Sequence, residues 1–130
     1  MRRRLAALSV DTCVVAGFVA LGRNSHSEGE AISNIAIVAA PFLIGLAVGW
    51  VACRHTDHPA GMRIGLVVWT STVVIGLALR GLVFSRPTPP VFILVAGTFL
   101  ALTLLGWRAV WAVGRRRIAR IGAAADLSAP

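Results

Sequence analysis

The chain has 130 residues and a formal net charge of +8, yet 57% of its residues are hydrophobic and only 14% are charged. About a quarter of the residues of a soluble domain are charged, so this composition, with a mean hydropathy of +0.80, excludes an ordinary soluble domain. All 13 basic residues are Arg, and they lie mainly at the ends of apolar blocks. That placement is typical of a membrane protein and argues against nucleic-acid binding.

The apolar residues form four blocks, each close to the roughly 20 residues that a helix needs to cross a bilayer. We predict an all-α protein, a four-helix transmembrane bundle that forms a single membrane domain over residues 1–120. The expected helices cover about residues 5–22, 28–53, 60–84 and 89–114. Residues 121–130 are small and featureless, which predicts a flexible C-terminal tail.

The first block follows three Arg residues, so it also resembles a secretory signal peptide. Asp11 interrupts the block and three further blocks follow, which favours a retained helix. The second block begins with a capping pattern, Ser27 and Glu30, and Pro41 within it predicts a kink. The fourth block follows Pro89 and Pro90, which suit a first helical turn.

The Arg residues also predict the orientation. If both chain ends are cytoplasmic, only Arg23, Arg80 and Arg86 lie on the outer side, as the positive-inside rule requires. The lack of Lys, with abundant Ala, Gly and Val, is typical of a GC-rich bacterial genome. We therefore expect a multi-pass protein of a bacterial plasma membrane, with an aromatic belt of Trp50, Trp107 and Trp111 at the inner interface.

The second and fourth blocks resemble each other. IVAAPFLIGLAVGWVA (37–52) aligns without a gap with LVAGTFLALTLLGWRA (94–109), and the Gly-Trp pair is the most specific match. The same offset places Arg23 on Arg80. Two hairpins in the same orientation predict a parallel internal repeat, related by an axis along the membrane normal. Trp50 and Trp107 should then lie at equal depth on opposite sides of the bundle.

Two ionisable residues are expected inside the membrane, where a charge needs a partner. Asp11 and Arg108 both lie about 9 Å from the inner interface, at a rise of about 1.5 Å per residue. We predict that they form an intramembrane charge pair, which would make the first and fourth helices neighbours. The alternative is that Arg108 extends to the headgroups while Asp11 hydrogen-bonds Thr70 or Thr72.

A second polar group is expected at the outer side, where it is either a site for an anion or headgroup or an ordinary solvated rim. Its members are Arg23, His26, Glu28, Glu30 and Arg80. The inner loop contains Cys53, His55, Asp57 and His58, but so short a loop rarely supplies tetrahedral geometry, and we predict no metal site. Catalytic residues and cofactors are not expected either, because the sequence has no nucleophilic triad, nucleotide-binding glycine loop or paired carboxylates.

Several motifs resemble a family of small actinobacterial membrane proteins known as domain of unknown function 3054 (DUF3054). They are Gly22-Arg23, Ser25-His26, Pro41-Phe42, Gly49-Trp50, Trp69, Thr72-Val73, Gly76, Leu79-Arg80 and Gly106-Trp107-Arg108. The resemblance implies a bacterial four-helix membrane protein and brings no activity with it. Asp11 and Arg108 belong to the family pattern.

Three functions remain open, and a membrane enzyme that acts on lipid headgroups ranks last among them. Minimal loops and the small-residue faces Gly45-x-x-x-Gly49 and Gly97-x-x-x-Ala101 favour a non-enzymatic accessory or structural component. Its partners would be the lipid bilayer and either further copies of the chain or a larger membrane complex, with no nucleic acid. The alternative is a small oligomeric transporter or channel that uses Asp11 and Arg108, or the outer cluster, as a polar path. A solvent-connected cavity at Asp11 would favour transport, and a closed core would favour the first function.

Overall fold

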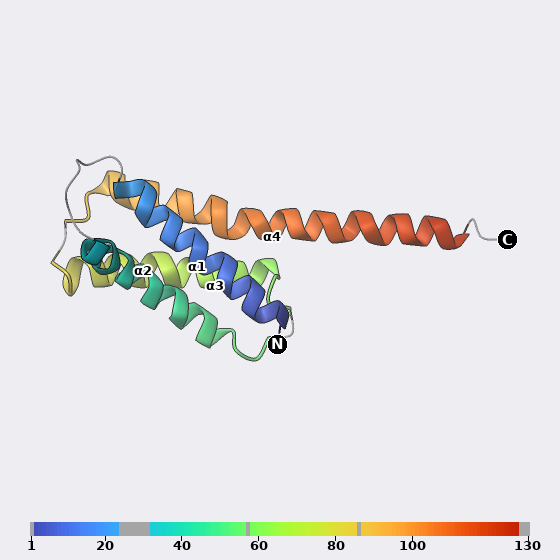
Figure 1. The fold of residues 1–130 in the computed structure, drawn as a ribbon, viewed down its shortest axis with the longest axis horizontal. Coiled ribbons are helices and arrows are strands. Elements are labelled where there is room, and N and C mark those ends of the chain that lie inside the picture. The colour runs from blue at the N-terminus through green and yellow to red at the C-terminus, as the bar shows by residue number, and fades with distance from the viewer. Residues whose placement is uncertain (1, 24–31, 57, 86, 128–130) are drawn as a thin grey trace.

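A computed structural model describes residues 2–23, 32–56, 58–85 and 87–127, with the backbone alone for residues 23, 32–36 and 122–127. The described residues form four helices: α1 (Arg2–Arg23), α2 (Ile32–Ala52), α3 (Met62–Leu82) and α4 (Pro90–Leu127). They run alternately in opposite directions, so α1 begins and α4 ends toward the same end of the molecule (Figure 1). The expected all-helical fold is therefore confirmed for this part of the chain.

Within the described residues, two of the expected boundaries differ from those observed by more than two residues. The first helix begins at Arg2 rather than Leu5, and α4 continues to Leu127, so the expected flexible tail at 121–130 is wrong as far as Leu127. Residues 121–127 include three consecutive Ala residues and no Pro. Ala has the best intrinsic helix propensity, and extending an existing helix avoids the cost of nucleation. Residues 28–31, expected in the second helix, lie outside the described residues.

Each helix packs against two neighbours. The backbones of α1 and α2, α2 and α3, α3 and α4, and α4 and α1 approach one another closely, whereas the described backbones of α1 and α3, and of α2 and α4, do not. Across the core, α2 and α4 meet only through side chains such as Phe42 and Phe92, whose ring centroids are 6.4 Å apart. The diagonal pairs are therefore separated by the core. Buried residues recur three or four positions apart, as one face of a helix requires; on α4 they are Ala96, Leu100, Leu104 and Arg108.

The core has an aromatic layer and a polar layer. Phe18 makes an edge-to-face contact with Phe42, with ring centroids 5.6 Å apart, and it also contacts Phe92 and Phe99. Asp11 lies seven residues before Phe18 on the same face of α1, about 10 Å along the helix axis. The polar layer is thus two helical turns away from the aromatic layer, toward the beginning of α1.

The closest helix pair is α2 and α3, because Gly45 and Gly49 have no side chains to hold the backbones apart. A Cβ atom added to Gly45 would lie 2.7 Å from the carbonyl oxygen of Ser71 and 2.9 Å from the Cα atom of Thr72. The same atom at Gly49 would collide with the Ser71 hydroxyl. The predicted small-residue face on the second helix therefore makes a close contact within the chain.

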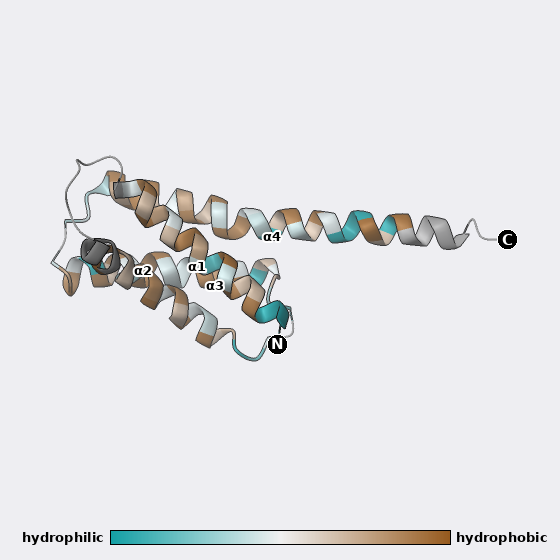
Figure 2. Ribbon diagram, in the orientation of Figure 1, coloured by the Kyte–Doolittle hydropathy of each residue, from teal (hydrophilic) through white to brown (hydrophobic). Residues whose placement is uncertain are grey.

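Three described helical segments are long and apolar enough to cross a membrane: Arg2–Gly22, Met62–Leu82 and Pro90–Ile121. In α2 the corresponding described segment, Ile37–Ala52, is apolar but shorter. Hydrophilic residues are concentrated at the beginning of α1, in the connection between α2 and α3, and in the distal part of α4 (Figure 2). The apolar surface between these regions is what lipid tails require.

Candidate functional site

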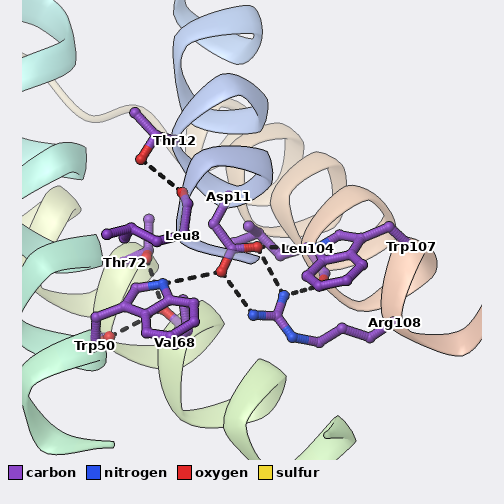
Figure 3. A network of polar contacts seen from close by, with 10 residues as sticks. Leu8, Asp11, Thr12, Trp50, Val68, Thr72, Leu104, Trp107 and Arg108 are labelled. Atoms are coloured by element: carbon purple, nitrogen blue, oxygen red, sulfur yellow. Dashed lines mark hydrogen bonds and ion pairs between the residues drawn. The ribbon is translucent and has the colours of Figure 1, made fainter. Parts of the chain in front are cut away.

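Asp11 and Arg108 are in direct contact in the centre of the polar layer. The Arg108 Nη1 atom donates to Asp11 Oδ1 at 2.8 Å, and Nη2 donates to Oδ2 at 2.7 Å, so the contact is bidentate (Figure 3). Both side chains are fully buried. The predicted contact is therefore present, and it joins α1 to α4.

Two tryptophans complete the coordination of the same carboxylate. The Trp50 indole N–H donates to Asp11 Oδ2 and the Trp107 indole N–H donates to Oδ1, each at 3.0 Å (Figure 3). Each carboxylate oxygen thus accepts one bond from an indole and one from the guanidinium. The four donors come from α2 and α4, the two helices that lie diagonally across the core from each other.

This arrangement corrects the expectation that Trp50 and Trp107 form an interfacial belt. Trp50 is buried and Trp107 is half-buried, whereas Trp111 is 53% exposed and remains compatible with an interfacial position. Although Trp50 and Trp107 belong to opposite helices, their indoles converge on one group instead of lying apart. A buried carboxylate needs hydrogen-bond donors, and an indole supplies one donor together with an apolar ring that packs in the core.

The Arg108 side chain is held by its own helix and by α3. Its Nη1 atom also donates to the carbonyl oxygen of Leu104 at 2.7 Å. Its guanidinium carbon lies 4.4 Å from the Trp107 ring centroid. A Cβ atom at Gly65 would lie 2.6 Å from Arg108 Cδ, so the absence of a side chain at Gly65 makes room for the arginine.

One atom of the network lacks a hydrogen bond. Arg108 Nε is buried and has no partner among the described residues. It faces Gly65, since a Cβ atom there would be 3.2 Å away. In contrast, each oxygen of Asp11 accepts one hydrogen bond from Arg108 and one from a tryptophan. The carboxylate is the better satisfied partner in this ion pair.

The alternative arrangement of Asp11 with a threonine does not occur. The Thr72 hydroxyl donates to the carbonyl oxygen of Val68 at 2.6 Å, and Thr70 is exposed. Arg108 does not extend to the surface, because its side chain has no exposed area. In an apolar core, a bidentate bond from an arginine satisfies the Asp11 carboxylate better than a single bond from a threonine hydroxyl would.

The predicted outer cluster can be assessed at one residue. Arg80 is half-buried, and its guanidinium carbon lies 4.4 Å from the Phe92 ring centroid, a cation–π geometry. The side chain of Arg23 and all of His26, Glu28 and Glu30 lie outside the described residues. The cluster as a whole stays a prediction.

At the other end, Arg4 ties the beginning of α1 to the end of α2. It donates to the carbonyl oxygens of Cys53, at 2.5 Å, and of Arg54. These carbonyls follow the last turn of α2, where backbone acceptors have no helical partner. In the connection that follows, Arg54 Nε contacts His55 Nε2 at 2.9 Å. Among the described residues no group of three or more His, Cys, Asp or Glu side chains is placed to hold a metal ion.

Sequence reasoning missed three members of this site. Trp50 and Trp107 were assigned to the interface, and Gly65 was not associated with Arg108. One signal was available: the two Gly-Trp pairs of the repeat lie at the depth of Asp11, and Trp107 directly precedes Arg108. A carboxylate at that depth requires donors, and the indoles were the nearest ones.

Apolar helices packed around a buried ion pair, three of them long enough among the described residues to cross a bilayer, define a helical membrane protein. The chain belongs to the family described as Protein of unknown function (DUF3054), whose model matches residues 8–111. That span contains both members of the ion pair and both tryptophans.

The chain is also similar to a curated protein, the Na(+)/H(+) antiporter NhaA 2 of Pelobacter propionicus. The two are 35% identical over 81 residues, which are 60% of this chain and 20% of the antiporter. The match therefore spans about a fifth of the antiporter's length. No solved structure matches the chain.

Proposed function

We propose that this protein is a non-enzymatic component of a cell membrane, in which Asp11 and Arg108 lock α1 against α4. One observation carries the proposal: the Asp11 carboxylate is fully buried and each of its oxygens accepts two hydrogen bonds. A group that binds or transfers a substrate has to be reachable and needs unused bonding capacity. The Asp11 carboxylate has neither in this structure.

The surroundings of the pair support a structural role. The buried residues nearest to it along α4 are Leu100 and Leu104, both without exposed area. A shallow surface pocket of about 300 Å³ lies elsewhere, on the side of α3 and α4, and is lined by Trp69, Ile93, Gly97 and Leu102 among others. The charges therefore sit in a closed core, which is the arrangement expected of an accessory or structural component.

The second candidate is a small oligomeric transporter or channel. The similarity to a Na(+)/H(+) antiporter favours it, as does a carboxylate inside an apolar helical domain. Transport would require Arg108 to release Asp11 so that water reaches the carboxylate from each side in turn. Arg108, Trp50 and Trp107 would then all have to withdraw, at the cost of four hydrogen bonds.

Reconstitution into proteoliposomes distinguishes the two candidates. Vesicles with a pH-sensitive dye inside receive an outward or inward Na⁺ gradient, and the internal pH is followed for the wild type and for Asp11→Asn. We expect both to match protein-free vesicles. A Na⁺-driven pH change in the wild type would establish transport. Its disappearance in Asp11→Asn protein that is still monodisperse before reconstitution would assign transport to Asp11 and reject a purely structural role.

We further propose that the chain is a parallel repeat with both ends in the cytoplasm of a bacterial cell. The matching Gly-Trp pairs support the repeat, and the Arg residues at one end support the orientation. The cyclic order of helix contacts is compatible with an axis that exchanges α1 with α3 and α2 with α4. In an experimental structure, the two hairpins should superpose by a rotation of roughly 180° about the membrane normal; superposition only through an in-plane axis would contradict the repeat.

Association with other chains is also part of the proposal. The protein would act within a homo-oligomer or a larger membrane complex, since its own connections are short and offer little surface outside the helices. Purification in a mild detergent, followed by mass measurement of the intact assembly, tests this. A species of one chain only, in lipid as well as in detergent, would reject it.

A further inference from the structure

The distal segment of α4, residues 111–121, continues beyond the part of the helix that packs in the core. Buried positions on α4 end at Arg108, and from Val110 to Ile121 every residue except Gly114 is exposed. The segment contains four of the 13 Arg residues of the chain: Arg115, Arg116, Arg117 and Arg120. Figure 2 shows this hydrophilic stretch well beyond the other three helices.

The ion pair allows the height of this segment to be compared with that of α1. Asp11 and Arg108 are in contact, and Arg4 lies seven residues before Asp11, as far as Arg115 lies after Arg108. At about 1.5 Å per residue, both arginines lie about 10 Å from the pair along their helices. Because the Arg108 side chain reaches back toward Leu104, Arg115 lies farther out than the beginning of α1, as Figure 2 shows for the hydrophilic stretch.

The beginning of α1 and the end of α2 mark the edge of the apolar part of the molecule (Figure 2). Arg2, Arg3, Arg54 and Arg63 are exposed at the same end. From Arg115 to Arg120 the helix rises about 8 Å, and the headgroup layer of a bilayer is roughly 5 to 8 Å thick on each side. The four arginines of the distal segment thus lie at and beyond this edge, and their long side chains can reach back to the lipid phosphates.

The distal segment also has an apolar side. Trp111, Ile118 and Ile121 are 53%, 73% and 71% exposed. At about 100° per residue they fall within about 80° of one another around the helix axis, and the arginines occupy the remaining arc. The segment therefore offers apolar contacts on one side and guanidinium groups around the remaining arc.

We propose that the distal segment of α4 binds anionic phospholipids through their headgroup phosphates, in the leaflet at the Arg-rich end. The arginines donate to phosphate oxygens, for which the guanidinium fork is suited, and Trp111 lies at the boundary with the acyl chains. An acidic protein surface would also supply negative charge, but the bilayer does not hold such a surface beside these arginines as it holds the lipid headgroups. This inference goes beyond the proposed function and does not depend on it.

Native mass spectrometry of the detergent-solubilised protein tests the proposal. The probes are phosphatidylglycerol and phosphatidylcholine with identical acyl chains, and glycerol phosphate as a source of free phosphate. Phosphatidylglycerol should be retained at least about tenfold more than phosphatidylcholine, and glycerol phosphate should not bind. Raising the NaCl concentration should weaken retention of phosphatidylglycerol, because the attraction is electrostatic.

Two matched variants locate the site. In one, Arg115, Arg116, Arg117 and Arg120 are replaced by Gln; in the other, Arg2, Arg3, Arg54 and Arg63 are replaced by Gln. Both lose four charges at exposed positions of the same end. The first should lose the preference for phosphatidylglycerol, and the second should keep most of it. Replacing the four α4 arginines by Lys keeps the positive charge and should restore retention to within a few fold.

Three results would overturn the proposal. Equal retention of the two lipids by the wild type would exclude anionic phospholipid as the ligand and leave an acidic protein surface as the partner of the segment. Equal losses in the two Gln variants would assign binding to overall charge. Retention of glycerol phosphate as strong as that of phosphatidylglycerol would identify a site for free phosphate instead.

Discussion

Trp50 and Trp107 donate their indole N–H groups to different oxygens of one carboxylate, that of Asp11, each at 3.0 Å. The two residues occupy equivalent positions in the matching sequences of the second and fourth helices. Their aspartate has no counterpart in the other half, where the same alignment places Val68, a residue that is also fully buried. The two matching sequences therefore meet at a single, unsymmetrical polar centre.

Substitutions of Asp11 and Arg108 should have strongly coupled effects on thermal stability. Asp11→Asn or Arg108→Ala alone leaves one buried group without its partner and should cost roughly 3 to 5 kcal/mol. Replacing both by apolar residues of similar size, Asp11→Leu with Arg108→Met, should recover much of this loss, because no charge then remains to be compensated. The measurement is the fraction of protein that stays monodisperse in detergent after heating.

Arg63→Ala is the control for the single changes, because Arg63 is exposed at the start of α3. It should leave the melting temperature nearly unchanged. If the double variant is as unstable as the worse single variant, the two charges are not coupled. Asp11 would then be a better candidate for transport chemistry than for a structural lock.

The tryptophans should contribute through their N–H groups rather than their rings. Trp50→Phe and Trp107→Phe keep an aromatic ring but remove one donor to the carboxylate, which should cost about 1.5 to 3 kcal/mol each. Trp111→Phe, at a position that is 53% exposed, should have little effect. In the Asp11→Leu, Arg108→Met background, Trp50→Phe should lower the stability much less than it does in the wild-type background. An unchanged cost there would assign the effect to packing.

Gly65 should be intolerant of a methyl group because of Arg108. In Gly65→Ala the new Cβ atom meets Arg108 Cδ at 2.6 Å and Leu105 Cδ2 at 3.0 Å, so the arginine has to move. We expect a loss of about 1 to 3 kcal/mol, as for other cases of overpacking. Gly106→Ala is the matched control, because nothing lies within 4 Å of its added Cβ atom. Ala favours the helix by about 1 kcal/mol over Gly, so that variant should be neutral or more stable; equal destabilisation of the two would contradict the role of Gly65.

The orientation can be measured by cysteine labelling in intact cells. In a background with Cys13→Ala and Cys53→Ala, a Cys at Thr88 should react with a membrane-impermeant maleimide. A Cys at Thr56 should react only after the membrane is permeabilised. Thr56 is exposed on the connection between α2 and α3, so access to it depends on the side of the membrane and not on burial. Labelling of position 56 in intact cells would reverse the orientation.

The sequence alone determined where apolar helices lie and which two charges share a level. Apolar blocks are visible in the sequence because a bilayer requires about 20 such residues per crossing. The pairing of Asp11 with Arg108 was predictable because the rise per residue sets the depth of each position along a helix. Both inferences depend only on distance along a helix axis.

Tertiary structure alone decided how each helix is rotated about its axis. Lipid and protein core are both apolar, so a membrane helix has no polar face to show which side is buried. The direction of the Trp50 and Trp107 indoles, and the space that Gly65 leaves for Arg108, therefore follow from packing between helices. The continuation of α4 to Leu127 was likewise hidden, because Arg-rich and Ala-rich residues after a membrane span are equally compatible with a disordered tail.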